Sequence, residues 1–311
     1  MTETELTTKE DRPWRLFPRI SKRVLQDNID GWLFIAPILL SALVFTVYPI
    51  FRSLDLSFRD WNPLGQDTFI GLDNYRMLFQ DRVFVIAMKN VLVYALYTIP
   101  AGLIWGIAVA MAMQNIKWRG FFRGLYFLPT ITSSVAISVV WTLILQPDFG
   151  LLNSALHLFG IVGPNWLGST KTALLSVSGI VVWLGTGYWM IVFLAGLLDI
   201  PTDYTDSARV DGASGWQVFR YITIPHLTPT IFYYLTNALI TVWVAFDIVY
   251  VMTSGGPANS TMMPAVYLYN QAWTQLNMGY ASAISWVMAI VIFIFTALHF
   301  WLSRKWVNYD R

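Results

Sequence analysis

The sequence predicts an all-α polytopic membrane protein with six transmembrane helices, and two observations support this prediction. First, 56% of the 311 residues are hydrophobic and only 12% are charged, about half the charged share of an ordinary soluble domain. Second, the charges are unevenly placed: six windows of about 20 to 25 residues together contain a single charged side chain, Asp247. Each window has the length that a helix needs to cross the hydrocarbon core of a bilayer.

The spans follow from these windows because a chain in lipid must satisfy its backbone amides within the segment, which a helix does. In chain order they are Trp32–Phe51, Val91–Met113, Gly124–Leu145, Leu174–Leu198, Ile231–Met252 and Ala283–Leu302.

The spans divide the chain into an amino-terminal segment (1–31), a transmembrane domain (32–302) and a tail (303–311). The loops on one side of the predicted membrane contain 14 Lys and Arg residues, and those on the other side contain five. By the positive-inside rule, both termini are expected to be cytoplasmic. Six of the 14 basic residues precede the first span: Lys9, Arg12, Arg15, Arg19, Lys22 and Arg23. The long polar start argues against a cleaved signal peptide.

The composition disfavours several other functions. A net charge of +2 is not that of a nucleic-acid-binding protein, which needs a basic face. The three histidines are far apart and form no metal-binding spacing, and the chain contains no cysteine. The phosphate-binding pattern GxxxxGK[ST] is also missing. An enzyme is therefore not expected, and any energy from ATP would come from another protein.

Two loops on the side with few basic residues are expected to be structured. Gly150–Phe159 has the pattern of a short amphipathic helix lying at the membrane interface. Thr253–Ser282 carries no charge and opens with a Gly-Gly-Pro turn. We expect this uncharged loop to dip back into the membrane or to line a cavity.

The stretch between the fourth and fifth spans is the most patterned loop. Pro201 can open a helix, and Asp206 suits the positive end of that helix. Ala208, Gly212 and Ala213 give it a side of small residues, and Phe219 with Ile222 offers an apolar side. The pattern predicts a helix at about 201–217 that docks on a cytoplasmic partner; a merely solvated connecting helix is the alternative.

This stretch resembles the EAA motif of the membrane subunits of bacterial ABC importers. The motif is EAA, three residues, Gly, then a later Phe and Ile-x-Leu-Pro. It stands here as Asp206-Ser207-Ala208, Gly212, Phe219 and Ile222-Thr223-Ile224-Pro225, with Asp for Glu, Ser for the first Ala and Ile for Leu. Further blocks resemble the carbohydrate branch of that family: Gly71–Tyr75, Arg123–Pro129, Gly150–Asn153, Phe246-Asp247, Gly255-Gly256-Pro257 and Gly279–Ala283.

The resemblance implies a MetI-like permease subunit of a maltose-type, binding-protein-dependent carbohydrate importer in the bacterial inner membrane. Its implied partners are a second homologous permease subunit, two ATPase subunits that use ATP and Mg, an external substrate-binding protein and membrane lipid. No cofactor bound by this chain and no nucleic acid are implied. The implied ATPase-coupling residues are Asp206, Ser207, Ala208, Asp211, Gly212, Ala213, Phe219 and Pro225.

The residues of the six windows indicate the charge class of the substrate but not its identity. Because no Lys or Arg lies inside the six windows, a neutral carbohydrate fits better than an anion such as glycerol 3-phosphate, which stays an alternative together with other polyols. A secondary transporter is less expected, since the spans hold one ionisable carboxylate alone. Asp247 on the fifth span would either face the substrate or pack against the partner subunit. The candidate pathway residues on this span are Asn237, Thr241, Trp243, Asp247 and Tyr250.

Overall fold

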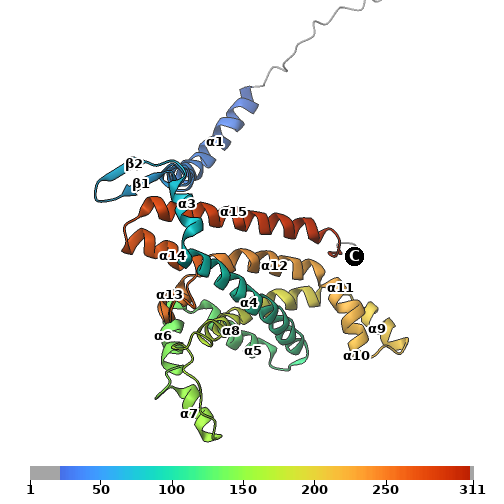
Figure 1. The fold of residues 1–311 in the computed structure, drawn as a ribbon. Coiled ribbons are helices and arrows are strands. Elements are labelled where there is room, and N and C mark those ends of the chain that lie inside the picture. Colours follow the sequence, from blue (N-terminus) through green and yellow to red (C-terminus); the bar gives the residue numbers. More distant parts are fainter. Residues whose placement is uncertain (1–21, 309–311) are drawn as a thin grey trace, which may run out of the picture. The chain divides into compact units, whose positions relative to one another are not determined.

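The computed structural model describes residues 22–308, which are mostly helical (Figure 1). The elements are α1 (Lys22–Ala42), the π-helical turn η1 (Leu43–Val47), α2 (Tyr48–Ser57), β1 (Arg59–Asn62), β2 (Gln66–Phe69), α3 (Asp73–Gln80), α4 (Arg82–Asn115), α5 (Arg119–Ile131), α6 (Ser134–Ile144), α7 (Leu151–Leu158), α8 (Ala173–Leu198), α9 (Thr202–Val210), α10 (Gly215–Val218), η2 (Phe219–Thr223), α11 (Ile224–His226), α12 (Thr228–Trp243), α13 (Asp247–Thr253), α14 (Pro264–Tyr269), η3 (Asn270–Thr274) and α15 (Met278–Ser303).

The described residues divide into two compact units, 22–52 and 53–308. Residues 1–21, which include Lys9, Arg12, Arg15 and Arg19 of the predicted amino-terminal segment, lie outside the described residues, as do residues 309–311 of the predicted tail.

Four helices in the described part of the chain are long and apolar enough to cross a membrane. They are Asn28–Ser57, Arg82–Gln114, Ala173–Leu198 and Met278–Ser303, and they contain all or nearly all of the first, second, fourth and sixth predicted spans. The prediction of a helical membrane protein is therefore confirmed.

The third and fifth predicted spans are each a pair of helices bent at a break, so the structure has six spans if each bent pair is counted as one. Gly124–Leu145 is divided into α5 and α6, which meet at an angle of 96°. Ile231–Met252 is divided into α12 and α13, which meet at 43°. At the first break, the Thr132 hydroxyl donates to the Leu128 carbonyl, so a short polar side chain competes for the backbone bonds of the helix. At the second, Asp247 begins a new helix, where its carboxylate suits the positive end.

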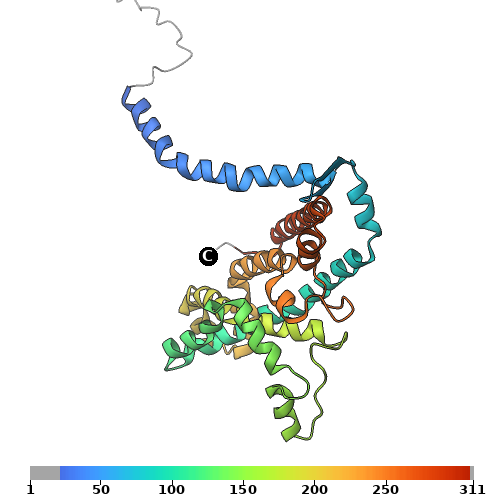
Figure 2. The ribbon, with the colours of Figure 1, turned by 90° about the vertical axis from the view of Figure 1, so that its left-hand side faces the viewer.

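Close packing of α4 on α8 forms the centre of the second unit. Two clusters of buried side chains lie along this contact. The first core cluster joins α4 to α13, α14 and α15, and the second joins the end of α4 to the end of α8 and the start of α12. On the other side of α8, a Cβ at Gly187 would lie 2.2 Å from the Tyr126 carbonyl oxygen, so only glycine lets α5 approach this closely. Figure 2 shows the red α15 above the orange α12, and α12 above the green helices of this unit.

One carboxylate joins the ends of three helices. Asp81 caps α4 by accepting hydrogen bonds from the Val83 and Phe84 amides. Its other oxygen accepts from the hydroxyls of Tyr267 on α14 and Tyr280 on α15. Burial raises the pKa of Asp81, but these hydrogen bonds outweigh burial and hold its pKa below the ordinary value. The charged form of Asp81 is thus the one that fastens α4, α14 and α15 together.

The loops at this end of the helices are ordered elements. The predicted short helix at Gly150–Phe159 is confirmed as α7, with Gly150 as its N-cap. The uncharged loop Thr253–Ser282 forms α14 and η3, and Asn90 on α4 donates to its Asn259 and Met262 carbonyls. A short antiparallel hairpin, in which Arg59 pairs with Phe69, was not predicted from the sequence.

Candidate functional site

A cavity of about 450 Å³ lies where the two broken helices meet α4 and α8. Its wall includes residues of α4, the α5–α6 junction, the middle of α8 and the α12–α13 junction: Tyr94, Thr98, Ile99, Gly102, Thr130, Ser134, Val181, Val182, Leu184, Gly185, Thr186, Trp189, Tyr234, Ala238, Thr241, Val242, Val244, Ala245, Phe246, Asp247, Ile248 and Val249. The volume is within the range of small-molecule sites in proteins.

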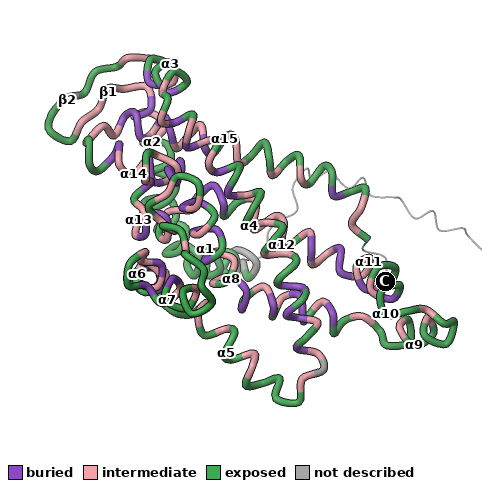
Figure 3. The backbone as a smooth tube through the Cα atoms, turned by 60° about the horizontal axis from the view of Figure 1, so that its bottom comes forward, coloured by how far each residue is buried: buried purple, intermediate pink, exposed green. Residues whose placement is uncertain are grey.

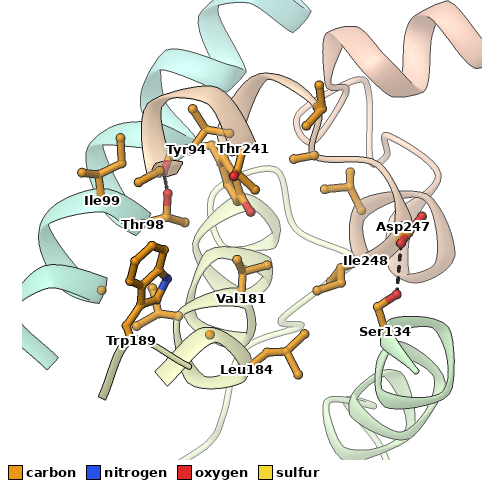
Figure 4. A pocket seen from close by; sticks show the side chains of 18 of the residues that line it. Tyr94, Thr98, Ile99, Ser134, Val181, Leu184, Trp189, Thr241, Asp247 and Ile248 are labelled. Carbon is orange, nitrogen blue, oxygen red and sulfur yellow. Dashed lines mark hydrogen bonds between the residues drawn. The ribbon is translucent and has the colours of Figure 1, made fainter. Parts of the chain in front are cut away.

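The two helix breaks are joined by one hydrogen bond at the cavity wall. Ser134 is the first residue of α6 and Asp247 is the first residue of α13. The Ser134 hydroxyl donates to Asp247 Oδ2 over 3.0 Å (Figure 4). Each break ends one helix and starts another, and in both cases the first residue of the new helix, Ser134 or Asp247, is polar.

The remaining polar groups of the wall are hydroxyls and one indole. Thr98, Thr130 and Thr241 donate to the carbonyls of Tyr94, Leu184 and Asn237, respectively. Each hydroxyl oxygen keeps lone pairs that can accept a further hydrogen bond. Trp189 adds an aromatic surface, which packs edge-on against Tyr234 with ring centroids 4.6 Å apart. Among the residues that line the cavity, Asp247 is the only one with a formal charge.

Of the five pathway candidates predicted from the sequence, the structure places two in this wall, Thr241 and Asp247. Trp243 is instead buried in the first core cluster and packs against Phe295. Tyr250 stacks on Phe246, with centroids 5.0 Å apart. Asn237 donates to the carbonyl of Tyr233 and is not part of the wall. The break before Asp247 changes the direction of α13 and so accounts for Tyr250, whereas Asn237 and Trp243 lie on α12 before the break and are set by the packing of that helix.

Sequence reasoning missed the contributions of the other helices. Thr98, Ser134 and Trp189 lie on α4, α6 and α8, and their meeting at one cavity depends on tertiary packing. The run Thr130 to Ser134, rich in small polar residues inside an apolar window, was the one available signal.

The α9–α11 segment, Thr202–His226, contains the EAA-like residues and has a different secondary structure from the one predicted. The single helix expected at about 201–217 is two helices, because α9 ends at Val210 and α10 begins at Gly215. Gly212 lies in the turn with φ of +83°, a backbone conformation that favours glycine. Ser214 then caps α10 in a reciprocal bond pair with Gln217.

The predicted coupling residues fall on two sides of the α9–α11 segment. Asp206, Ser207, Asp211 and Gly212 are exposed, Ala208 and Ala213 are half-buried, and Asp206 forms a surface ion pair with Arg209. Phe219, expected on the docking side, packs instead against the second core cluster. Pro225 follows it and is half-buried.

The exposed apolar surface of the α9–α11 segment is formed by residues that the sequence analysis did not single out. Val210 is 88% exposed, Trp216 is 69% exposed and Tyr221 is 74% exposed. Figure 3 shows α9 as largely exposed, in contrast with the buried stretches of α8 and α12. Apolar side chains held this far out on a short, capped turn are suited to contact with another protein.

The base of this segment is held by the end of the chain. Trp306 packs against the second core cluster beside Phe219 and Ile224. The backbone amide of Asn308 donates to the Thr228 hydroxyl, which itself donates to the Pro225 carbonyl. These contacts join the residues that follow α15 to the start of α12 and to the end of the α9–α11 segment. Within residues 22–308, no group of three or more His, Cys, Asp or Glu side chains is arranged to hold a metal ion.

Comparisons with known proteins cover most of the chain. Residues 99–308 match the model of a family described as binding-protein-dependent transport system inner membrane component. The chain is 35% identical over 296 residues to the probable ABC transporter permease protein YesP of Bacillus subtilis (strain 168), covering 93% of this chain and 95% of YesP. It is 33% identical over 285 residues to the lactose transport system permease protein LacF of Rhizobium radiobacter, covering 89% of this chain and 95% of LacF.

A solved structure shares the fold. A chain of a bacterial ABC transporter involved in the import of the acidic polysaccharide alginate superposes with a TM-score of 0.81 at 24% sequence identity, covering 92% of this chain and 100% of that chain.

Proposed function

Because the chain belongs to the family of binding-protein-dependent transport system inner membrane components, we propose that it forms half of the pathway of an ATP-driven importer for a neutral sugar or oligosaccharide. Its fold is that of a MetI-like ABC importer permease, and members of this family are transport components rather than enzymes. The chain is accordingly a multi-pass component of the inner membrane.

The character of the central cavity is the observation that carries the sugar proposal. Hydroxyl groups and one carboxylate can bond sugar hydroxyls, and the exposed face of Trp189 can contact the apolar side of a sugar ring. No basic side chain lines the wall, so an anionic solute such as glycerol 3-phosphate would lack a countercharge there. The lactose permease among the relatives supports the same class of substrate.

The partners expected from this family complete the proposal. A second, homologous permease subunit would supply the other half of the pathway, and an external binding protein would deliver the sugar. Two ATPase subunits would bind ATP and Mg and dock on the α9–α11 segments. Their closure would draw these segments together and change which side the pathway faces.

The experiment is reconstitution. The chain, its partner permease, the ATPase subunits and the binding protein are incorporated into liposomes, and uptake of radiolabelled glucose, lactose, maltose and glycerol 3-phosphate is measured. We expect ATP-dependent accumulation of at least one of the neutral sugars. Accumulation of glycerol 3-phosphate alone would contradict the sugar proposal, and accumulation without the ATPase subunits would indicate a secondary transporter.

The proposed orientation places both termini and the α9–α11 segment in the cytoplasm. Since the chain contains no cysteine, the labelling of a single introduced cysteine shows on which side of the membrane that position lies. Cysteines replacing the exposed Leu64 and Thr170 should react with a membrane-impermeant maleimide in intact spheroplasts. A cysteine replacing the exposed Ser214 should react only after the membrane is opened. Labelling of the Ser214 position from outside would reverse the orientation.

A further inference from the structure

The hairpin that contains α7 buries one polar side chain, Asn153, and exposes several large apolar ones. We define the α7 hairpin as residues 146–172. Asn153 is only 3% exposed: it accepts a hydrogen bond from Trp166 Nε1 over 2.7 Å and donates to the carbonyls of Pro147 and Pro164. Leu152 and Trp166 anchor the base against the first core cluster. The hairpin is therefore a built element with a satisfied polar interior.

The outer surface of this hairpin is apolar. Leu151, Ala155 and Leu158 are spaced as one stripe along α7, and all three are exposed. Leu158 is 86% exposed and Val162, just beyond the end of α7, is 82% exposed; Phe159 between them is also exposed. A loop that faced water would show the reverse arrangement, because exposing several large apolar side chains together costs free energy.

Charge and position indicate what covers this surface. From Phe149 to Thr170 the chain contains no Asp, Glu, Lys or Arg, whereas Asp148 and Lys171 stand at the two ends of this stretch. The hairpin extends directly from α6, at the end of a broken span. In Figure 1 it points downward from α6, whereas α12 and α15 run across the picture, and Figure 2 also shows it projecting downward from the other helices. An element that leaves the end of a bundle in this direction runs along the bilayer surface.

We propose that the apolar tip of the α7 hairpin, Leu158 to Val162, inserts into the lipid at the bilayer surface and anchors this subunit in the membrane plane. Ser154 and His157, exposed on the adjacent side of α7, would face the headgroups and water. Such interfacial helices bury their apolar face roughly 5–10 Å into the boundary between headgroups and acyl chains. The anchor would fix the height of this side of the subunit while other helices move during transport.

The test uses nitroxide spin labels in the full transporter complex, placed in nanodiscs of phosphatidylcholine and phosphatidylglycerol at a ratio of 3:1. Single cysteines replace Leu158, Val162 or, as a matched exposed control at the hairpin base, Thr170. Collision rates with oxygen, which enters lipid, are compared with those of a water-soluble nickel chelate. We expect labels at 158 and 162 to collide mainly with oxygen, and the label at 170 to collide mainly with nickel.

Two results would overturn the proposal. Strong nickel collisions at position 162 would place the tip in water, and weak collisions with both reagents would show that a protein subunit covers it. Neither result depends on the substrate, so this outcome is independent of the sugar proposal. ATP hydrolysis by each labelled complex, compared with that of the unlabelled complex, verifies that the label has not disrupted the assembly.

Discussion

Replacing Val210 with aspartate is expected to separate this permease from its ATPase subunits while leaving its membrane domain folded. Val210 ends α9 with its side chain 88% exposed, next to the turn at Gly212 and near the exposed Trp216. If these side chains are the contact with the ATPase, Val210→Asp places a carboxylate in a desolvated apolar interface. A central interface residue contributes about 2 kcal/mol or more, which corresponds to roughly 30-fold weaker binding.

The measurement is the affinity of purified ATPase subunits for the permease pair, together with sugar uptake after reconstitution. Leu64→Asp is the control, because it places the same carboxylate at a similarly exposed apolar residue, 81% exposed, in the turn between β1 and β2. It should leave the affinity for the ATPase unchanged. Equal ATPase affinity for Val210→Asp and the unmodified chain would show that α9 is not the docking element.

The structure also changes the reason for expecting an effect at Gly212. The sequence suggested that glycine keeps a helix face small for close contact. In the structure, a Cβ added at Gly212 meets no atom of this chain within 4 Å, and the residue has φ of +83°. A substitution here would therefore act first on the turn that orients α9 against α10, since left-handed backbone costs a residue with a side chain about 1–2 kcal/mol.

The membrane helices could be predicted because their signal is additive along the chain. The hydrophobicity of a window depends only on its own residues and not on how the rest of the chain folds. All six windows could therefore be found from composition. The two breaks could not be found in this way, because neither adds a charge: Thr132 and Ser133 at the first are small and polar, and Val244 to Phe246 at the second are apolar. Bending depends on the partners of these residues, such as Ser134 bonding to Asp247, and those partners are distant in the sequence.

The same breaks explain why the pathway residues were only partly predicted. The stripe Trp243, Asp247, Tyr250 assumes an uninterrupted helix with side chains spaced every three to four residues. With the helix broken after Trp243, this spacing no longer relates Trp243 on α12 to Asp247 and Tyr250 on α13. Trp243 lies in the core, and Tyr250 stacks on Phe246. Asp247 was recognised for its charge alone, a property that does not depend on the direction of the helix.

Asp247→Asn is expected to lower sugar transport by roughly 2- to 30-fold without preventing assembly. Asparagine keeps the shape of the side chain but removes the charge, and hydrogen bonds to charged groups are worth about 1.5–3 kcal/mol, whereas neutral ones are worth about 1 kcal/mol. A sugar hydroxyl that donates to the carboxylate in the cavity would lose most of this difference. The measurements are the apparent affinity and maximal rate of uptake in the reconstituted complex, with thermal unfolding of the same samples.

Ser134→Ala separates the two roles that Asp247 could have. It removes the bond that joins α6 to α13 but keeps the carboxylate in the cavity. If Asp247 binds sugar, Ser134→Ala should change uptake much less than Asp247→Asn does. If Asp247 serves packing, both variants should lose thermal stability together, and uptake per assembled complex should stay near that of the unmodified chain. If both Asp247→Asn and Asp247→Ala leave the affinity and rate of uptake unchanged, this carboxylate does not bind sugar. No other residue that lines the cavity carries a charge that could take its place.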